Sequence, residues 1–285
     1  MPDFQLAVID VDGTLINKQG KISAADKEAI GKARDKGILV ALSTGRVVPA
    51  CTYLLEELGL DGFHIFCDGA LVYNPATAQT CYSQPLCQGP LLSAIEFVRE
   101  HNIYLELYTI LDYYVEYENW SAKMHREFFR ISPTVTDFKK VALTQDVQKI
   151  ELMVHDQTER RGAELFMSRF EDDFQGAELF MSRFEDDFHF SIARAPAYPE
   201  VEFVNIVSPG ISKGRALEKM AAQMGISLRN VIAFGDGSND LPLFRAAGFG
   251  VAMGNARAEL KEIADYVTLD VEESGLAAAF NKFLI

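Results

Sequence analysis

Short runs of apolar residues, each ending in polar ones, recur near the beginning of the chain. Residues 4–10 and 38–43 form two such runs, and residues 23–37 between them have the spacing of a helix with Ser23 as its N-cap. Neither run alternates apolar and polar positions, so we expect helices to bury both faces of these strands. Residues 64–68 form a third buried strand. This pattern predicts a βαβ unit in a parallel sheet.

The same succession of short buried strands and helices returns at the other end of the chain. Helices are expected at residues 211–224 and 241–247, and strands at residues 231–236, 249–253 and 266–269. Together the two ends predict one α/β domain with a doubly wound, mostly parallel sheet of the Rossmann-like kind.

The middle of the chain follows a different pattern. At residues 103–109 and 113–117, apolar residues alternate with polar ones, which is typical of antiparallel strands with one face exposed. Helix patterns precede and follow these two strands, at Leu91, Ile95 and Val98 and at Trp120, Met124 and Phe128. Further strands are expected at residues 149–155, 188–194 and 201–207. The middle therefore predicts an α+β insert.

The chain length also favours two domains. At roughly 150 residues per domain, 285 residues correspond to about two. We expect the insert to occupy residues 84–207 and to interrupt an α/β core made of residues 1–83 and 208–285. Pro85 and the Pro209-Gly210 pair mark the expected hinges between the two parts.

One internal repeat lies within the insert. The segment GAELFMSRFEDDF occurs at residues 162–174 and again at 176–188, and the two 14-residue units match at 13 positions, differing at Gln175 and His189. A repeat fold needs at least ~3 copies to bury a core, so this is a local duplication. Three phenylalanines of each unit have the i, i+4, i+8 spacing of one apolar helix face.

The net charge of the chain restricts the kinds of partner that it is expected to bind. The chain has 27 Lys and Arg against 41 Asp and Glu, a formal net charge of −14, and such a field repels nucleic-acid backbones and anionic membranes. The first residues lack the pattern of a signal peptide, and no apolar run reaches the ~18 residues of a membrane span. We expect a cytoplasmic protein, a monomer or homodimer, that binds metal ions and small molecules and neither nucleic acid nor membrane.

Two acidic residues follow the first predicted strand. In Asp10-Val11-Asp12-Gly13-Thr14 they lie two positions apart, at the carboxyl edge of the sheet, where open α/β folds bind ligands. One carboxylate can face a metal ion and an electrophile while the second stays near enough for proton transfer. Taken alone, such a pair also occurs in solvated acidic turns.

A second acidic motif, GDGSND at residues 235–240, follows a later buried strand at the same edge. Carboxylates brought together in one cleft are costly unless a cation is bound. Oxygen ligands without His or Cys favour Mg²⁺ completed by water and phosphate. A polar loop is the alternative, and the coincidence of two such motifs counts against it.

Two further segments supply hydrogen-bond donors and positive charge. The STGR segment at residues 43–46 offers hydroxyl and backbone N–H groups at a helix N-terminus, which suit a phosphate oxygen. Lys213 opens a helix just after the insert and can neutralise a transferring phosphoryl group. A lysine at a helix start opposes the macrodipole, and this local misfit indicates function. Either segment alone would be interpreted as a surface loop. We interpret Arg46, the last residue of STGR, as a structural residue and not as one that binds substrate.

In this order, the motifs DxDGT, STGR, SKG and GDGSND resemble the four motifs of the haloacid dehalogenase superfamily. The insert between the second and third motifs is similar, in position and strand pattern, to the type IIB cap of the Cof-like sugar-phosphate phosphatases. The resemblance covers essentially the whole chain. It implies a hydrolase core with an inserted α+β cap that selects the substrate.

The resemblance also implies a role for each motif residue. Asp10 would attack phosphorus and become a phosphoaspartate, and Asp12 would protonate the leaving alcohol and then activate water. The cofactor would be Mg²⁺, held by Asp10, the backbone carbonyl of Asp12 and Asp236, with Asp240 in support. The phosphoryl oxygens would be bound by Thr44, Gly45, Lys213 and Asn239. These groups supply the positioning and charge neutralisation that phosphoryl transfer requires.

We therefore expect a Mg²⁺-dependent phosphatase for small phosphorylated metabolites, such as sugar phosphates or phosphorylated cofactors. The alternatives are a phosphomutase of the same superfamily and a non-catalytic protein that binds phosphate or Mg²⁺, although a pure binder has no use for Asp12. The 5 scattered histidines are not expected to act in catalysis. The sequence leaves open whether the tyrosines of residues 112–117 pack inside the cap or face the substrate.

Overall fold

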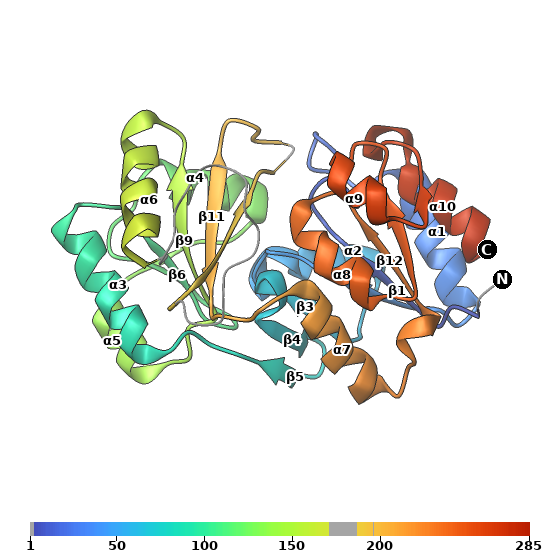
Figure 1. The fold of residues 1–285 in the computed structure, drawn as a ribbon, viewed down its shortest axis with the longest axis horizontal. Helices are drawn as coiled ribbons and strands as arrows, with labels where there is room; N and C mark the ends of the chain where they lie inside the picture. Colours follow the sequence, from blue (N-terminus) through green and yellow to red (C-terminus); the bar gives the residue numbers. More distant parts are fainter. Residues whose placement is uncertain (1–2, 171–186, 196) are drawn as a thin grey trace.

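The computed structural model describes residues 3–170, 187–195 and 197–285. Within these ranges, a five-stranded parallel sheet and a six-stranded sheet lie in two separate halves of the molecule, and a three-stranded sheet lies beside the first (Figure 1). None of the helices in these ranges is long and apolar enough to cross a membrane. The expected α/β fold with an inserted α+β part is confirmed.

The parallel sheet has the strand order β14-β13-β12-β1-β2. Its strands are β1 (Leu6–Ile9), β2 (Leu39–Leu42), β12 (Val231–Gly235), β13 (Phe249–Ala252) and β14 (Tyr266–Val267). All four neighbouring pairs are parallel, and every residue of β1 and β12 is buried. Burial on both faces explains why these strands lack polar alternation.

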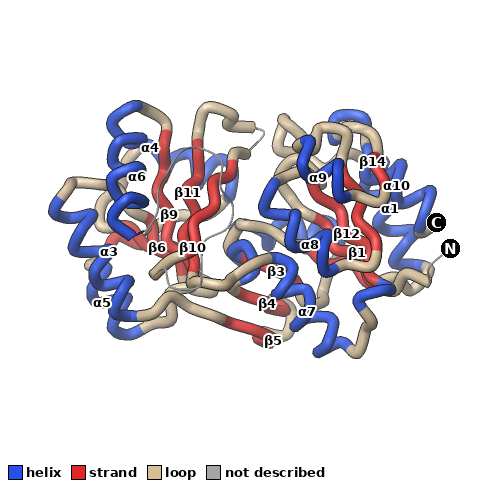
Figure 2. Tube along the Cα trace, in the orientation of Figure 1, coloured by secondary structure: helices blue, strands red, loops and turns tan. Residues whose placement is uncertain are grey.

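Helices cover both faces of this sheet. They are α1 (Ala24–Asp35), α2 (Thr52–Leu58), α7 (Lys213–Met224), α8 (Leu241–Ala246), α9 (Ala258–Ile263) and α10 (Gly275–Phe283). Helices α1 and α10 lie side by side on one face, and α7 and α8 lie on the other (Figures 1 and 2). The expected N-cap is confirmed, because the Ser23 side chain accepts a hydrogen bond from the backbone N–H of Asp26.

A small antiparallel sheet extends the edge of the core. It consists of β3 (His64–Phe66), β4 (Leu71–Asn74) and β5 (Gln79–Ser83). Strand β3 touches the parallel sheet through a parallel bridge between Ile65 and Ser43. The turn after β3 contains Asp68 with φ of 54°, a left-handed conformation that is uncommon for a residue other than glycine.

The second half of the molecule, which we call the cap, comprises the described residues between 88 and 207. Its strands are β6 (Glu106–Tyr108), β7 (Tyr113–Val115), β8 (Thr134–Val135), β9 (Lys149–Val154), β10 (His189–Ala193) and β11 (Glu202–Val207). They form a sheet of order β10-β11-β9-β6-β7-β8, antiparallel except between β7 and β8. Its helices are α3 (Gln88–Glu100), α4 (Trp120–Met124), which continues as a π-helical turn over His125–Phe129, α5 (Phe138–Thr144) and α6 (Gln157–Phe170). One face of the sheet packs on α3, α5 and α6 through a separate apolar cluster.

The expectation that β6 and β7 have one face exposed is wrong. All residues of both strands are buried, and Glu106 has no exposed surface at all. The alternation of polar and apolar residues is real, but the polar face is turned toward the core instead of solvent. Tyr108 on this face lines a cavity between cap and core.

The duplicated segment lies partly outside the described residues. Helix α6 contains the first copy as far as Phe170, and Phe166 and Phe170 are buried and lie against Phe188. The expected apolar helix face is confirmed for these residues. The other phenylalanines of the duplication, at positions 174, 180 and 184, fall within residues 171–186, which the structure does not describe.

Candidate active site

The acidic motifs meet at the carboxyl edge of the parallel sheet. Asp10 directly follows β1, and Asp236 directly follows β12. Because β1 and β12 are adjacent parallel strands, both carboxylates reach the same edge. They line a cavity of about 290 Å³ whose walls come from both core and cap. Asp12, Thr44, Gly45 and Asn239 also line this cavity.

Lys213 lies between two buried carboxylates. Its Nζ is 2.6 Å from Oδ1 of Asp10 and 2.6 Å from Oδ1 of Asp240, and its side chain has no exposed surface. Burial raises the pKa of Asp10 well above its ordinary value, although Lys213 acts in the opposite direction. Burial lowers the pKa of Lys213, but the two carboxylates outweigh it and raise the pKa overall. The misfit of a lysine at a helix start is therefore explained by this ion-pair cluster.

Asp236 completes a set of oxygen donors beside Asp10. Burial and the neighbouring Asp240 raise the pKa of Asp236 to about 7. Asp236 also lies close to Gly13, where a Cβ would be 2.3 Å from its Oδ2, so a side chain at position 13 would push the carboxylate away. Asp10, Asp236 and Asp240 present oxygens within 4.8 Å of one another. Hard oxygen donors whose negative charges crowd together suit a divalent cation such as Mg²⁺.

Asp240 stabilises the loop that carries Asp236. Its Oδ2 accepts hydrogen bonds from the backbone N–H groups of Asp236, at 3.1 Å, and Gly237, at 3.0 Å. Its other oxygen is bound by Lys213. With both oxygens engaged by the protein, Asp240 holds the shape of the loop that carries Asp236.

Asp12 is held by Arg46. The guanidinium donates from Nε to Oδ2 at 2.8 Å and from Nη2 to Oδ1 at 2.6 Å. Phe128 and Phe129 of the cap lie over the same guanidinium, with ring centroids 5.1 and 4.7 Å away. Burial lowers the pKa of Arg46, but Asp12 outweighs it and raises the pKa overall. Arg46 therefore joins the core carboxylate to the cap.

The remaining motif residues cluster around Asp68. Asn239 donates from Nδ2 to Oδ1 of Asp68 at 2.9 Å, and Ser191 of the cap donates to Oδ2 at 3.0 Å. A Cβ on Gly45 would lie 3.1 Å from the same carboxylate. Thr44 is buried and accepts a hydrogen bond at Oγ1 from the backbone N–H of Arg46. The structure thus brings together all the residues expected at the site, and adds Asp68.

The cap contributes polar side chains that the sequence analysis did not single out. Those lining the cavity are Tyr108, His125, Lys149, Glu151, Arg194 and Asn205. A signal for two of them was present, because Lys149 and Glu151 are charged residues two positions apart in an otherwise apolar strand. His125 was grouped with the scattered histidines, whereas its ring lies in the cavity wall. Tyr108 and Asn205 carried no local signal.

Matches to known proteins cover almost the whole chain. The haloacid dehalogenase-like hydrolase family matches residues 7–280. A 5-amino-6-(5-phospho-D-ribitylamino)uracil phosphatase of Bacillus subtilis is 32% identical over 283 residues, which cover 97% of this chain and 96% of the relative. A pyridoxal phosphate phosphatase of Escherichia coli is 28% identical over 294 residues, which cover 99% of each protein.

Solved structures share the arrangement of core and cap. A haloacid dehalogenase-like hydrolase from Bacteroides thetaiotaomicron superposes with a TM-score of 0.81 at 25% identity, covering 98% of this chain and 99% of that chain. A subclass IIB sugar phosphatase of the same superfamily superposes with a TM-score of 0.73 at 23% identity, covering 98% of both chains. At that identity the second likeness shows the fold alone.

Proposed function

The chain belongs to the haloacid dehalogenase-like hydrolase family and is a phosphatase, and we propose that it hydrolyses small phosphorylated metabolites through a phosphoaspartate at Asp10. The observation that carries this proposal is the pairing of Asp10 with the buried Lys213, beside a cavity that Asp10 and Asp12 both line. A nucleophile, a countercharge and a second carboxylate for proton transfer are the groups that phosphate ester cleavage needs.

Two displacements make up the proposed reaction. A carboxylate oxygen of Asp10 attacks phosphorus, the bond between phosphorus and the alcohol oxygen breaks, and Asp12 gives its proton to the departing alcohol. Asp12 then takes a proton from a water molecule whose oxygen attacks the phosphoaspartate. Inorganic phosphate leaves, Asp10 is restored, and Asp12 is again protonated for the next cycle.

Phosphate binding is assigned to groups around the nucleophile. We propose that Thr44, Gly45, Lys213 and Asn239 bind the phosphoryl oxygens. Asp10, Asp236 and the backbone carbonyl of Asp12 are the proposed ligands of Mg²⁺, which would neutralise charge on the phosphoryl group. Asp240 supports Asp236 through the two backbone hydrogen bonds described above.

The alcohol part of the substrate is expected to lie against the cap. We propose that residues 84–207 form the cap domain and residues 1–83 and 208–285 the core. The two connections between them touch, because Nε2 of Gln84 donates to the carbonyl of Pro209 at 2.8 Å. Adjacent connections support a hinge at this point. The named relatives act on a ribitylaminouracil phosphate and on pyridoxal phosphate, so phosphorylated cofactors and their precursors are the first substrates to test.

Phosphate release from a panel of such esters, with Mg²⁺ present, tests the proposal. Wild-type protein is expected to release phosphate, and Asp10→Asn protein to release none while keeping its fold. Asp12→Asn is expected to lower kcat by ~10²–10⁴-fold on alkyl esters and by less on p-nitrophenyl phosphate, whose leaving group needs no proton. A folded wild-type protein that releases no phosphate from any ester would contradict the proposal. An isomerised product with a requirement for a bisphosphate activator would instead indicate a phosphomutase.

A further inference from the structure

A row of polar side chains crosses the cap sheet on the face turned toward the core. Ser191 on β10 pairs with Asn205 on β11, which pairs with Glu151 on β9, which pairs with Glu106 on β6. Residues paired directly across strands share one face. Asn205 and Glu151 are each 3% exposed and line the cavity. Burying such groups is costly unless they find hydrogen-bonding partners.

Lys149 sets the orientation of the Asn205 amide. Its Nζ donates to Oδ1 of Asn205 at 2.7 Å, to Oε1 of Glu151 at 2.9 Å and to the carbonyl of Gly45 at 3.1 Å. An ammonium group has three donors and no acceptor, so the amide oxygen of Asn205 must face Lys149. The Nδ2 group of Asn205 therefore keeps its N–H donors, for which the described residues provide no acceptor. The contact with Gly45 places this row beside the proposed phosphate-binding loop.

Glu151 keeps an acceptor next to this donor. The hydroxyl of Tyr108 lies 3.2 Å from Oε2 of Glu151 but only 2.6 Å from Oε2 of Glu106. A phenol has one proton to donate, and Tyr108 donates it to the nearer acceptor, Oε2 of Glu106. Oε2 of Glu151 is consequently open to another donor. The cap wall thus presents a free N–H donor and a free oxygen acceptor on paired positions of adjacent strands.

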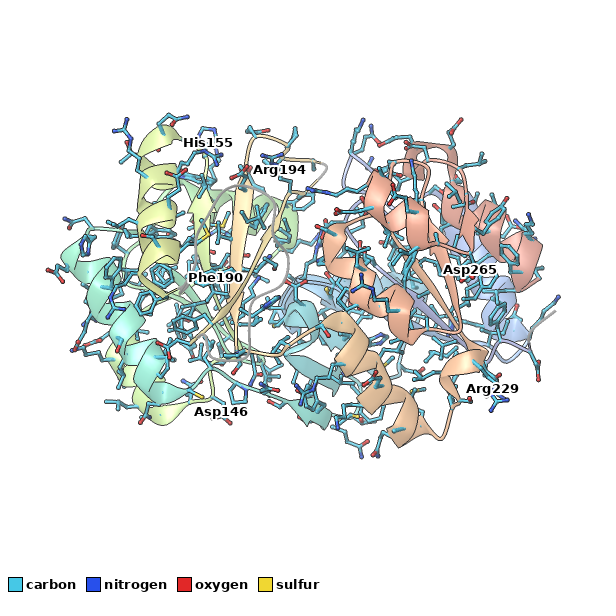
Figure 3. The ribbon with its side chains drawn as sticks, in the orientation of Figure 1. Asp146, His155, Phe190, Arg194, Arg229 and Asp265 are labelled. Atoms are coloured by element: carbon cyan, nitrogen blue, oxygen red, sulfur yellow. The ribbon has the colours of Figure 1, made fainter. Side chains whose placement is uncertain are left out.

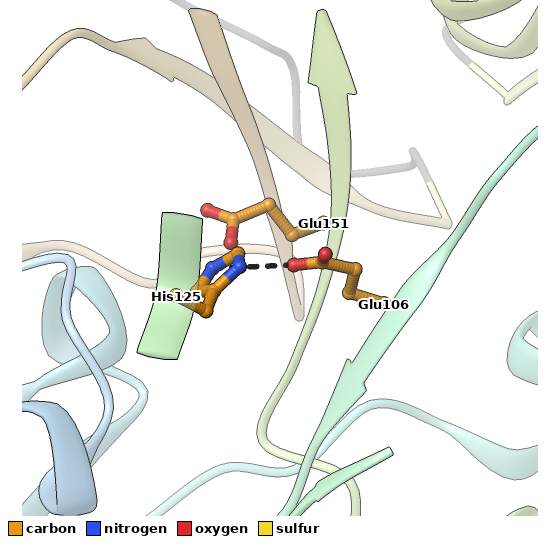
Figure 4. Close-up of side chains that lie close together, drawn as sticks. All are labelled: Glu106, His125 and Glu151. Carbon is orange, nitrogen blue, oxygen red and sulfur yellow. Dashed lines mark ion pairs between the residues drawn. The ribbon is translucent and has the colours of Figure 1, made fainter. Parts of the chain in front are cut away.

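The same acidic residues could be interpreted as a cation site, since Glu106, His125 and Glu151 lie together (Figure 4). The contacts speak against this. Glu106 already accepts hydrogen bonds from three hydroxyl groups, those of Tyr108, Tyr113 and Ser121. The ammonium of Lys149 neutralises Glu151 and would repel a second cation. The cluster is therefore a hydrogen-bonded support for Glu151.

Apolar side chains continue the wall beyond the polar row. Phe203 and Ala193 are paired across β11 and β10 and both line the cavity. Phe129 and Ile131 line it as well. Arg194, which directly follows β10 in the cap half of the molecule (Figure 3), forms an ion pair with Glu202 and so is not a free cation. This part of the wall suits a flat, uncharged group.

We propose that Asn205 and Glu151 form a subsite that selects esters whose alcohol part carries a lactam heterocycle. The ring carbonyl accepts a hydrogen bond from Nδ2 of Asn205, and the neighbouring ring N–H donates to Oε2 of Glu151. The apolar wall around Phe203 covers the face of the ring. The inference rests on the proposed function, because the subsite binds the leaving group of that reaction. A hydroxyl can both donate and accept, so a simple polyol does not require a separate donor and acceptor.

Binding to Asp10→Asn protein, measured by calorimetry, separates the subsite from turnover. Two probes share the same phosphate end: 5-amino-6-(5-phospho-D-ribitylamino)uracil, which has a lactam edge, and ribitol 5-phosphate, which has no ring. We expect the first to bind at least roughly tenfold more tightly. Adding Asn205→Asp, which replaces the donor by an acceptor of the same size, is expected to lower that ratio at least roughly tenfold. The same chemical change at an exposed cap residue, Gln157→Glu, is expected to leave the ratio unchanged.

Three results would overturn the subsite. They are a ratio near one between the two probes, an unchanged ratio in a folded Asn205→Asp variant, and equally tight binding of pyridoxal 5′-phosphate, an aromatic phosphate without a lactam. If Asn205→Asp does not fold, the ratio between the two probes is measured in Glu151→Gln protein instead. An unchanged ratio there would overturn the subsite. The proposed function fails by a different result, the absence of phosphate release by wild-type protein, so the two failures are distinguishable.

Discussion

Arg46 holds both carboxylate oxygens of Asp12, at 2.8 and 2.6 Å. Two parallel hydrogen bonds from a planar guanidinium define the orientation of a carboxylate as well as its position. The rings of Phe128 and Phe129 cover the guanidinium from the cap side. Asp12 therefore takes its orientation from a residue that is itself in contact with the cap.

Replacing Arg46 by Lys is expected to lower kcat/KM about tenfold on alkyl phosphate esters, because a point charge cannot hold Asp12 in the same two-bond geometry. The loss on p-nitrophenyl phosphate is expected to be smaller, since that leaving group departs without a proton. Phosphate release from both esters is the measurement. Arg34→Lys is the control. Arg34 donates to the carbonyls of Leu58 and Gly59 at the C-terminal end of α2 and does not contact Asp12. Equal losses on both esters would contradict a positioning role for Arg46.

Replacing Lys213 by Met is expected to abolish turnover and to lower the free energy of unfolding by about 3–5 kcal/mol, because it leaves buried carboxylates without their cation. Urea unfolding in the presence of a chelator measures the stability. Adding Asp240→Asn is expected to restore part of the stability without restoring turnover. Lys219→Met, on the exposed side of the same helix, is the control. Wild-type stability in the Lys213→Met protein would show that the ion-pair cluster is not required.

His64 gives the fold a predictable dependence on pH. Burial lowers the pKa of His64 to about 4, against about 6.5 in an unfolded chain. Its Nδ1 accepts the backbone N–H of Leu42 at 3.0 Å, and a proton there would break this bond. The unfolded state therefore binds more protons between these two pKa values, so stability is lost as pH falls from about 6.5 to 4, by about 3 kcal/mol in total.

Comparison of wild type with His64→Gln checks this dependence. The wild-type free energy of unfolding is expected to fall more steeply between pH 7 and pH 4.5, and the difference between the two proteins isolates His64 from the many carboxylates. His101→Gln, at an exposed histidine of the cap, is expected to follow the wild-type curve. Parallel curves for wild type and His64→Gln would contradict the assignment.

Deleting residues 162–175 is expected to leave phosphate release essentially unchanged and thermal stability equal or higher. After the deletion the second copy continues directly from Arg161, so Phe180 and Phe184 take the sequence positions of the buried Phe166 and Phe170. Neither copy contains a motif residue. Deleting residues 176–189 instead yields the same chain with Gln in place of His189, which provides a matched control. Loss of folding in both shortened chains would show that the duplication is integrated into the cap.

The core and the position of its acidic motifs were predictable from the sequence because their determinants are local. A strand without polar alternation is buried on both faces, and the residue that follows it stands at the carboxyl edge of the sheet. This placed Asp10 and Asp236 correctly without any knowledge of their contacts. The N-cap at Ser23 was equally predictable, because it depends on residues within one turn.

The cap wall could not be derived in this way. Glu106, Glu151 and Asn205 come from strands that are far apart along the chain, and only the antiparallel register brings them into one row. Which face of an alternating strand meets water depends on what packs against it, and here the core covers the polar face of the cap sheet. The pairing of Arg46 with Asp12 also joins residues that are distant along the chain and meet only in the folded structure. The sequence by itself determined the strands of the parallel sheet and the edge at which the acidic motifs meet. Tertiary structure alone decided which distant polar groups meet there, because a hydrogen bond depends on distance in space and not on separation along the chain.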